Sequence, residues 1–224
     1  MASVLEREMF SEAAAAQLLR VPQSTLHYWL EGSTRGERRY RPIIRIEPKN
    51  TRTVTWAEFV EATLLRGYRR ERGVPMAELR KFVDLLRDEF GVPYPLADRR
   101  PYASGRALVY DAQTAAGLDA EFCLVAVAND QLMLTPASQS FMERIEWKGN
   151  EPTAWRPIAA EEKSPVRVDP DKRFGRPSIK GISTEILWEE EDAGEDVEVI
   201  AETYNLDVAD VRWALAYENS LRAA

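Results

Sequence analysis

Residues 23–28 include five short or planar polar side chains, and their types suit hydrogen bonding to nucleic acid. Residues 23–30 read Gln-Ser-Thr-Leu-His-Tyr-Trp-Leu. Leu26, Trp29 and Leu30 are spaced i, i+3 and i+4, which predicts the buried face of a helix. The other face then presents groups that can bond to phosphates and base edges. These predicted DNA contacts are Gln23, Ser24, Thr25, His27 and Tyr28.

A shorter helix is predicted directly before this one. Ser11 is a favourable N-cap, and Glu12 lies in the first turn, near the positive end of the helix dipole. Residues 13–19 are mostly small, and residues 20–22 (Arg-Val-Pro) end the helix because proline cannot continue it. Two helices joined by a tight turn are typical of a helix-turn-helix whose second helix enters the major groove. The alternative is an ordinary pair of helices in a helical domain.

Basic residues are concentrated after the second helix. Residues 33–52 contain seven basic residues, Arg45 among them, and two acidic residues. The β-prone runs 41–46 and 51–55 flank a turn signal at 48–50, so we predict a two-stranded wing. Guanidinium groups can bond two phosphate oxygens at once. The predicted backbone-contacting residues are Arg35, Arg38, Arg39, Arg41, Lys49 and Arg52. The alternative is a solvated charge run on a loop.

Two further amphipathic helices are predicted at residues 56–70, with Thr55 as cap, and at residues 75–90, ended by Gly91. Their apolar stripes are interpreted as core.

Residues 10–90 resemble the winged helix-turn-helix of the MerR type. The matching features are S-x-x-x-A from Ser11, S-T-L-x-Y-W at residues 24–29, and the order of wing and two helices. The resemblance implies that Ser24, Thr25 and Tyr28 contact DNA and that the wing arginines contact its backbone. This chain has His27 where an arginine is usual.

The charge of the chain is unevenly distributed. The 224 residues carry a net charge of −7, which alone argues against nucleic-acid binding. The first hundred residues hold 18 basic and 14 acidic side chains, and the remainder holds 12 and 23. We therefore expect DNA binding in the N-terminal third, with acidic regions limiting non-specific binding. The alternative is that the acidic surface only keeps the chain soluble.

Several chemistries are excluded by residue counts. Cys123 is the only cysteine and His27 the only histidine. This excludes a disulfide framework and a Cys/His zinc site, and leaves only His27 for a catalytic triad. Cys123 lies in the apolar run F-C-L-V-A-V and is predicted to be buried. With no catalytic constellation in the sequence, we expect no enzyme activity, no cofactor and no metal. Without a signal peptide or a long apolar run, the expected location is cytoplasmic, with no membrane partner.

The middle of the chain, residues 94–163, is predicted to be a small β-rich domain. Turn signals at 129–130 and 149–150 each separate two strand-like runs. The predicted strands are residues 106–110, 122–128, 131–135, 143–147 and 153–157.

The C-terminal part is predicted to contain a hairpin and three helices. Two short extended pieces flank residues 174–177, and Gly181 is expected at a position that needs the backbone freedom of glycine. The helices are predicted at 185–193, capped by Thr184, and at 197–204 and 208–219. The exposed side of the last two helices is acidic and would repel phosphate, so we expect this pair to bind protein. The acidic residues are Glu198, Glu202, Asp207 and Asp210.

This segment resembles the small three-helix module of Vap-type antitoxins, which neutralise PIN-domain ribonuclease toxins. The matching motifs are D-P at 169–170, F-G-R-P-S-I at 174–179, K-G at 180–181 and A-L-A-Y-E at 214–218. The usual Gly-Thr-Arg appears here as Gly-Ile-Ser at 181–183. The resemblance implies a toxin whose metal-holding carboxylates can pair with basic side chains. The candidate toxin-binding residues are Arg173, Phe174, Arg176 and Lys180.

Together these patterns predict an α+β fold, mainly α, in three domains: residues 1–93, 94–163 and 164–224. We expect an antitoxin that binds operator DNA as a homodimer, represses its own operon and blocks a PIN-domain ribonuclease toxin. The alternative is a stand-alone MerR-like transcriptional regulator that responds to a small effector. Such regulators dimerise through a long helix, and residues 75–90 are too few for one.

Overall fold

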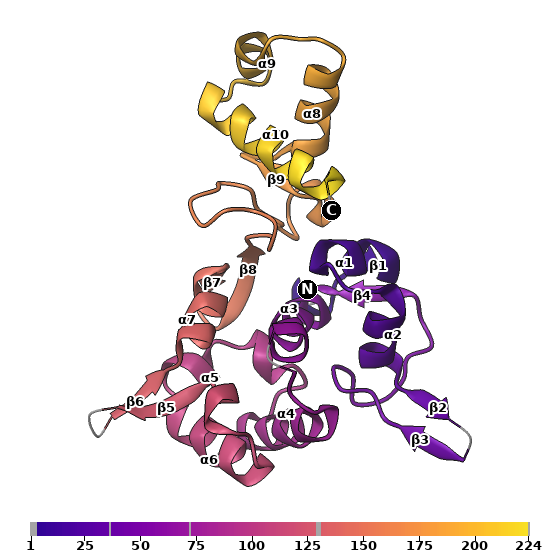
Figure 1. Cartoon of the computed structure of the whole chain (residues 1–224), viewed down its shortest axis with the longest axis vertical. Coiled ribbons are helices and arrows are strands. Elements are labelled where there is room, and N and C mark those ends of the chain that lie inside the picture. The colour runs from indigo at the N-terminus through magenta and orange to yellow at the C-terminus, as the bar shows by residue number, and fades with distance from the viewer. Residues whose placement is uncertain (1–3, 36, 72, 129–130, 224) are drawn as a thin grey trace. The chain divides into compact units, whose positions relative to one another are not determined.

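The computed structural model (Figure 1) describes residues 4–35, 37–71, 73–128 and 131–223, and for residues 35, 38, 70, 71 and 121 only the backbone. Contacts between residues divide the chain into two compact units, residues 1–152 and 153–224. Helices predominate over small two-stranded sheets, which confirms the predicted fold class, α+β and mainly α. Most of the predicted middle domain, residues 94–152, belongs to the first unit.

The predicted pair of short helices is confirmed. Helix α1 (Glu12–Leu19) begins at Ser11, whose side chain accepts a hydrogen bond from the backbone N–H of Ala14 at 3.2 Å. It ends at Arg20, which adopts the left-handed conformation with φ 51°. Helix α2 (Gln23–Glu31) follows, and its Leu26, Trp29 and Leu30 are buried as predicted.

The wing hairpin lies earlier in the chain than predicted. Strands β2 (Ser33–Arg35) and β3 (Arg38–Tyr40) pair in antiparallel orientation, whereas the predicted strand at 41–46 is irregular. The reason is that Ile43 and Ile44 are both buried, so the side chains do not alternate between two faces. The backbone N–H groups of these isoleucines donate to the carbonyl oxygen of Trp29, at the end of α2.

The second predicted wing strand pairs with the N-terminus instead. Strand β4 (Thr53–Thr55) is antiparallel to β1 (Glu8–Ser11), which follows the 3-10 helix η1 (Val4–Glu6). The Thr55 side chain caps α3 (Trp56–Arg66) in a capping box with Glu58. The π-helical turn η2 (Gly67–Glu71) and helix α4 (Met76–Phe90) complete this region, and α4 ends at Gly91 as predicted.

The rest of the first unit is more helical than the sequence suggested. Residues 106–110, predicted as a strand, begin helix α6 (Arg106–Ala116). The buried residues Val109, Ala112, Gln113 and Ala116 have helical spacing, and this signal outweighs the β-prone run at its start. The other helices are η3 (Pro95–Ala97), α5 (Arg100–Ala103), η4 (Ala120–Phe122) and α7 (Pro136–Glu143).

Both predicted hairpins of this region form. Strand β5 (Val125–Ala128) pairs with β6 (Gln131–Leu134), and the predicted turn at 129–130 lies outside the described residues. Strand β7 (Ile145–Lys148) pairs with β8 (Glu151–Trp155) across Gly149, which has φ 63°. Cys123 is buried as predicted, and burial raises the pKa of its thiol.

The three predicted helices of the second unit form, but its two-stranded hairpin lies later in the chain than predicted. The pieces that flank residues 174–177 are joined by an isolated bridge between Arg167 and Ser178. Strands β9 (Ser178–Ile179) and β10 (Ile182–Ser183) pair across Gly181, which has φ 85°. Helices α8 (Thr184–Asp192), α9 (Val197–Tyr204) and α10 (Val208–Arg222) enclose an apolar core, and the 3-10 turn η5 (Arg173–Gly175) precedes the hairpin. The cap of α8 is Ser183, because Thr184 is already helical and its hydroxyl donates to buried Glu218 at 2.5 Å. None of the helices described in either unit is long and apolar enough to cross a membrane.

Candidate functional site

The first turn of α2 is accessible to solvent. Gln23 and Ser24 are exposed, and Thr25 is half-buried. The buried stripe of Leu26 and Trp29 lies on the other side and packs the helix into the unit. The structure therefore leaves these three polar residues facing away from the core, as the sequence predicted.

Tyr28 is held by an arginine from a distant helix. Its hydroxyl accepts a hydrogen bond from Nη2 of Arg80 at 2.7 Å, and the guanidinium lies 5.5 Å from the ring centroid. Nε of Arg80 also donates to the carbonyl oxygen of Arg41 at 3.0 Å. Arg80 thus links α4, α2 and the segment that follows the hairpin. No sequence pattern pointed to it, because its partners lie 39 and 52 positions away.

His27 and Arg52 are bound to a buried carboxylate. His27 Nδ1 lies 2.9 Å from Glu12 Oε1, and Arg52 Nη1 donates to Glu12 Oε2 at 2.8 Å. Burial alone would raise the pKa of Glu12, but the hydrogen bonds from His27 and Arg52 outweigh it and the pKa is lowered. Both predicted DNA contacts therefore also fasten α1 to α2 and to the residues before β4.

The hairpin β2–β3 extends beside α2 (Figure 1) and carries the first predicted wing arginines. Along the backbone Arg35 is opposite Arg38, and Arg39, which is exposed, is opposite Thr34. Gly32, which has φ 74°, connects the end of α2 to the hairpin. A Cβ atom at this position would lie 2.2 Å from the carbonyl oxygen of Tyr40, so only glycine fits.

Arg45 is part of the core and not of a cationic edge, which corrects its place among the wing residues. Its side chain is 1% exposed and forms an ion pair with Glu31. Its Nε and Nη2 donate to the two carboxylate oxygens of Glu58 at 2.8 and 3.0 Å.

Lys49, also predicted to face phosphate, donates to the same Glu58 carboxylate at 2.8 Å and to the Tyr94 hydroxyl at 3.3 Å.

This cluster keeps its charges despite burial. Desolvation opposes the charged forms, but the mutual hydrogen bonds dominate, so the pKa values of Arg45 and Lys49 are raised and that of Glu58 is lowered. Glu31 is the last residue of α2, and Glu58 lies in the first turn of α3. The cluster therefore fixes α2, the helix predicted to contact DNA, to the rest of the unit.

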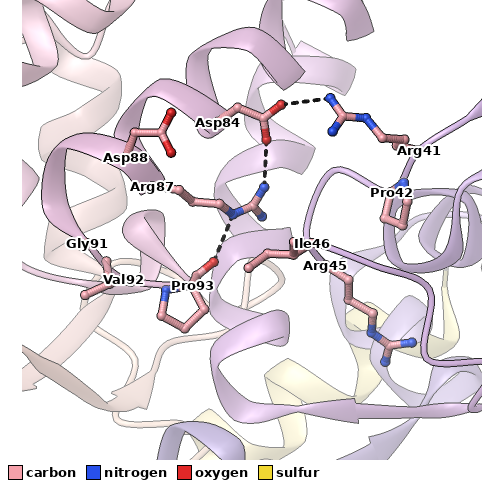
Figure 2. Close-up of a pocket in the computed structure, with 10 residues that line it drawn as sticks. All are labelled: Arg41, Pro42, Arg45, Ile46, Asp84, Arg87, Asp88, Gly91, Val92 and Pro93. Atoms are coloured by element: carbon pink, nitrogen blue, oxygen red, sulfur yellow. Dashed lines mark hydrogen bonds and ion pairs between the residues drawn. The ribbon is translucent and has the colours of Figure 1, made fainter.

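A groove of about 580 Å³ lies at the base of the hairpin (Figure 2). Arg87 spans it: the guanidinium donates to the carbonyl oxygen of Pro93 at 3.0 Å and to Asp84 at 3.1 Å. It also donates to the carbonyl oxygens of Ile43 and Ile44 at 2.7 and 2.5 Å. Arg41, another predicted wing residue, is 69% exposed and lies 3.5 Å from Asp84. The groove is lined by Arg41, Pro42, Arg45, Ile46, Asp84, Arg87, Asp88, Gly91, Val92 and Pro93.

The predicted toxin-binding residues lie in and beside the turn η5 of the second unit. Phe174 is 90% exposed, and Arg173 and Arg176 are also exposed. Arg173 Nε donates to the carbonyl oxygen of Gly181 at 2.7 Å, and Arg176 forms an exposed ion pair with Glu185 at 3.3 Å.

Lys180 is engaged within its own unit. Its Nζ lies 2.9 Å from Asp207 and 2.8 Å from Asp210. Two of the four acidic residues predicted on the face of α9 and α10 thus bind a lysine, while Glu198 and Glu202 are exposed. Within the described part of the chain, no group of three or more Cys, His, Asp or Glu side chains is arranged to hold a metal ion.

The two units define a class of protein in which two short helices and a two-stranded hairpin come first and a second hairpin with three helices follows. Residues 166–217, which contain this hairpin and most of the three helices, match the family model "Protein of unknown function (DUF433)".

A relative matches almost the whole chain. The uncharacterized protein Rv2308 of Mycobacterium tuberculosis is 30% identical over 230 residues, which cover 99% of this chain and 94% of the relative. The chain therefore belongs to the same family as Rv2308. The crystal structure of Rv2018 from Mycobacterium tuberculosis is similar with a TM-score of 0.76, over 95% of this chain and 100% of that chain. Its sequence identity is 21%, so this similarity shows a shared fold.

Proposed function

We propose that the protein is an antitoxin: it binds operator DNA as a homodimer through its first unit and a PIN-domain ribonuclease toxin through its second. The observation that carries the DNA-binding half is the exposed first turn of α2 beside the hairpin β2–β3. A helix of this kind reads base edges in the major groove, while cations on a neighbouring hairpin contact the backbone.

The geometry supports a division of roles among the predicted contacts. Gln23, Ser24 and Thr25 are accessible for base contacts, and Arg39 and Arg41 are accessible for phosphate contacts. Residues whose polar atoms are bound within the protein, such as His27 and Lys49, position these elements. Arg35 and Arg38 are assigned to phosphate contacts because they lie opposite each other on the backbone of the hairpin.

The toxin-binding half rests on the resemblance of the C-terminal module to Vap-type antitoxins and on the exposed basic turn around Phe174. Residues 153–224 hold nine basic and sixteen acidic side chains, a net charge of −7. Such a surface is poorly suited to phosphate and well suited to a protein partner.

The DNA-binding proposal is tested by titrating the full chain against the promoter fragment of its own operon at several salt concentrations. Alanine at Arg39 and Arg41 should weaken binding to all sequences and lower the salt slope by about 1 for each lost phosphate contact. Alanine at Gln23 or Ser24 should instead reduce the preference for the promoter over random DNA. The control is Arg212→Ala, an exposed arginine of α10. Equal losses on promoter and random DNA for both sets would contradict base readout.

The toxin-binding proposal predicts that a PIN-domain protein is encoded beside the gene, and it is tested with that protein. Alanine at Arg173 and Arg176 should weaken inhibition of its ribonuclease activity and leave operator binding unchanged. Unchanged inhibition would remove these two residues from the interface. Light scattering of the full chain tests the proposed homodimer.

A second candidate function is a MerR-like transcriptional regulator that responds to a small effector. The groove at the base of the hairpin favours it, because a ligand that displaced Arg41 from Asp84 would touch the segment that leads from β3. A transporter or enzyme gene beside this one, and no PIN-domain gene, would support this candidate over the antitoxin.

A further inference from the structure

The segment 172–176, here called the Phe174 loop, places an aromatic ring in solvent. Phe174 is 90% exposed, the highest value among the large hydrophobic residues that are exposed in the described chain. Aromatic side chains gain much by burial, so a solvent-facing ring is a feature that needs a reason.

The backbone of this loop is also unfavourable. Arg173, Phe174 and Gly175 are consecutive residues with φ of 47°, 53° and 73°. Glycine adopts this left-handed region readily, but arginine and phenylalanine do so at an energetic penalty because of their Cβ atoms. Non-glycine residues in this conformation occur where the surrounding structure holds them, and they are concentrated at binding sites.

The loop is held in this shape by its own hydrogen bonds. The N–H of Gly175 donates to the carbonyl oxygen of Lys172 at 3.0 Å, and Arg173 Nε donates to Gly181 at 2.7 Å. Asp169 accepts from the backbone N–H of Asp171 at 2.8 Å and pairs with Lys172 at 3.0 Å. None of these contacts uses the phenyl ring, so the fold fixes the loop without burying Phe174.

Charge is sharply segregated around the loop. Residues 172–180 contain four basic residues and no acidic residue, whereas residues 181–211 contain eleven acidic residues and no basic residue. Lys180 is bound by Asp207 and Asp210, and Lys172 pairs with Asp169. Arg173 and Arg176 are the exposed guanidinium groups next to Phe174 in the chain, and Arg176 forms an exposed pair with Glu185.

We propose that Phe174 is the anchor of the toxin interface: its ring enters an apolar pocket of the toxin, and carboxylates at the rim of that pocket face Arg173 and Arg176. This inference rests on the proposed antitoxin function and names the surface that the toxin must present. A preformed loop loses little conformational entropy on binding, and aromatic side chains are enriched in the buried centres of protein interfaces. A nucleic-acid partner is disfavoured because the neighbouring acidic stretch would repel phosphate.

The test measures binding of the full chain to the PIN-domain protein of the same operon by calorimetry. Phe174→Ala should lower the affinity by about 30-fold or more, as expected for a hot spot. The matched control is Val127→Ala on β5 of the first unit, where a side chain that is 57% exposed is shortened outside the unit proposed to bind the toxin. This variant should bind like the unaltered protein.

A second variant separates binding from folding. Phe174→Gly removes the ring and suits the left-handed backbone. Its Tm should therefore be the same as that of the unaltered protein or higher by roughly 2 °C. Its toxin affinity should fall as far as that of Phe174→Ala, while its operator affinity stays unchanged.

Each outcome has a defined meaning. If the unaltered protein does not bind the PIN-domain protein, the proposed function fails and the anchor fails with it. If the unaltered protein binds and both Phe174 variants bind as tightly as Val127→Ala, the anchor is overturned and the proposed function stands. Loss of operator affinity in Phe174→Gly would overturn the assignment to a protein partner in favour of base stacking.

Discussion

Replacement of Arg45 by alanine tests whether this residue belongs to the core or to a phosphate-binding edge. Arg45 and Arg41 lie four positions apart in the same basic run, and the sequence treats them alike. In the structure Arg45 is 1% exposed and bonded to Glu58 and Glu31, whereas Arg41 is 69% exposed.

The expected magnitude follows from what the substitution leaves behind. Breaking a buried ion pair by removing one partner typically costs about 3–5 kcal/mol, because the other charge stays buried without compensation. Glu58 keeps its bonds to Lys49 and to the backbone N–H of Thr55, so we expect the lower end, about 3 kcal/mol. Arg41→Ala should cost at most about 1 kcal/mol, since its pair with Asp84 is solvent-exposed.

The measurement is equilibrium unfolding in urea, followed by far-ultraviolet circular dichroism, on Arg45→Ala, Arg41→Ala and the double variant Arg45→Ala/Glu58→Gln. The double variant should recover part of the loss, because it also removes the uncompensated charge. Operator affinity is measured at a temperature at which all variants are folded. There Arg41→Ala should weaken operator binding more than Arg45→Ala does. Equal free energies of unfolding for the two single variants would refute the structural role of Arg45.

Three further outcomes are expected. Gly32→Ala should destabilise the protein by about 1–3 kcal/mol and weaken operator binding, because the new Cβ would lie 2.2 Å from the Tyr40 carbonyl oxygen. Urea unfolding measures the first effect and a binding titration the second. Burial raises the pKa of Glu61 from 4.5 to about 8, so between these values the folded state holds a proton that the unfolded state has released, and stability falls as pH rises through this window. Glu61→Gln should flatten that decline in thermal melts between pH 5 and 8.5, and an unchanged slope would contradict the assignment. Ser11→Ala should lower the free energy of unfolding by about 1 kcal/mol through loss of the cap on α1, and no change would show that water replaces it.

Local signals predicted the helices well. The caps at Ser11 and Thr55 and the stripe of Leu26, Trp29 and Leu30 depend on residues three or four positions apart, and the structure has each of them as expected. The approximate positions of the three helices of the second unit also follow from helical spacing. These features depend on neighbours within one or two turns, and a sequence displays such neighbours directly.

Other features depended on partners far away along the chain. The wing was predicted one segment too late, because β-prone residues at 41–46 gave no sign that Ile43 and Ile44 would both be buried against the end of α2. Residues 106–110 were predicted as a strand from their β-prone sequence. In the structure they begin α6, whose helical stripe of buried residues packs against other elements.

The sequence by itself determined the pair of short helices near the N-terminus, the class of fold and the segregation of charge along the chain. Tertiary structure alone decided which charged groups are available. Arg45 is enclosed by Glu31 and Glu58, Tyr28 is bound by Arg80, and Phe174 is left in solvent. The physical reason is that the composition of a segment fixes its charge, whereas burial and pairing depend on elements that come together only when the chain folds.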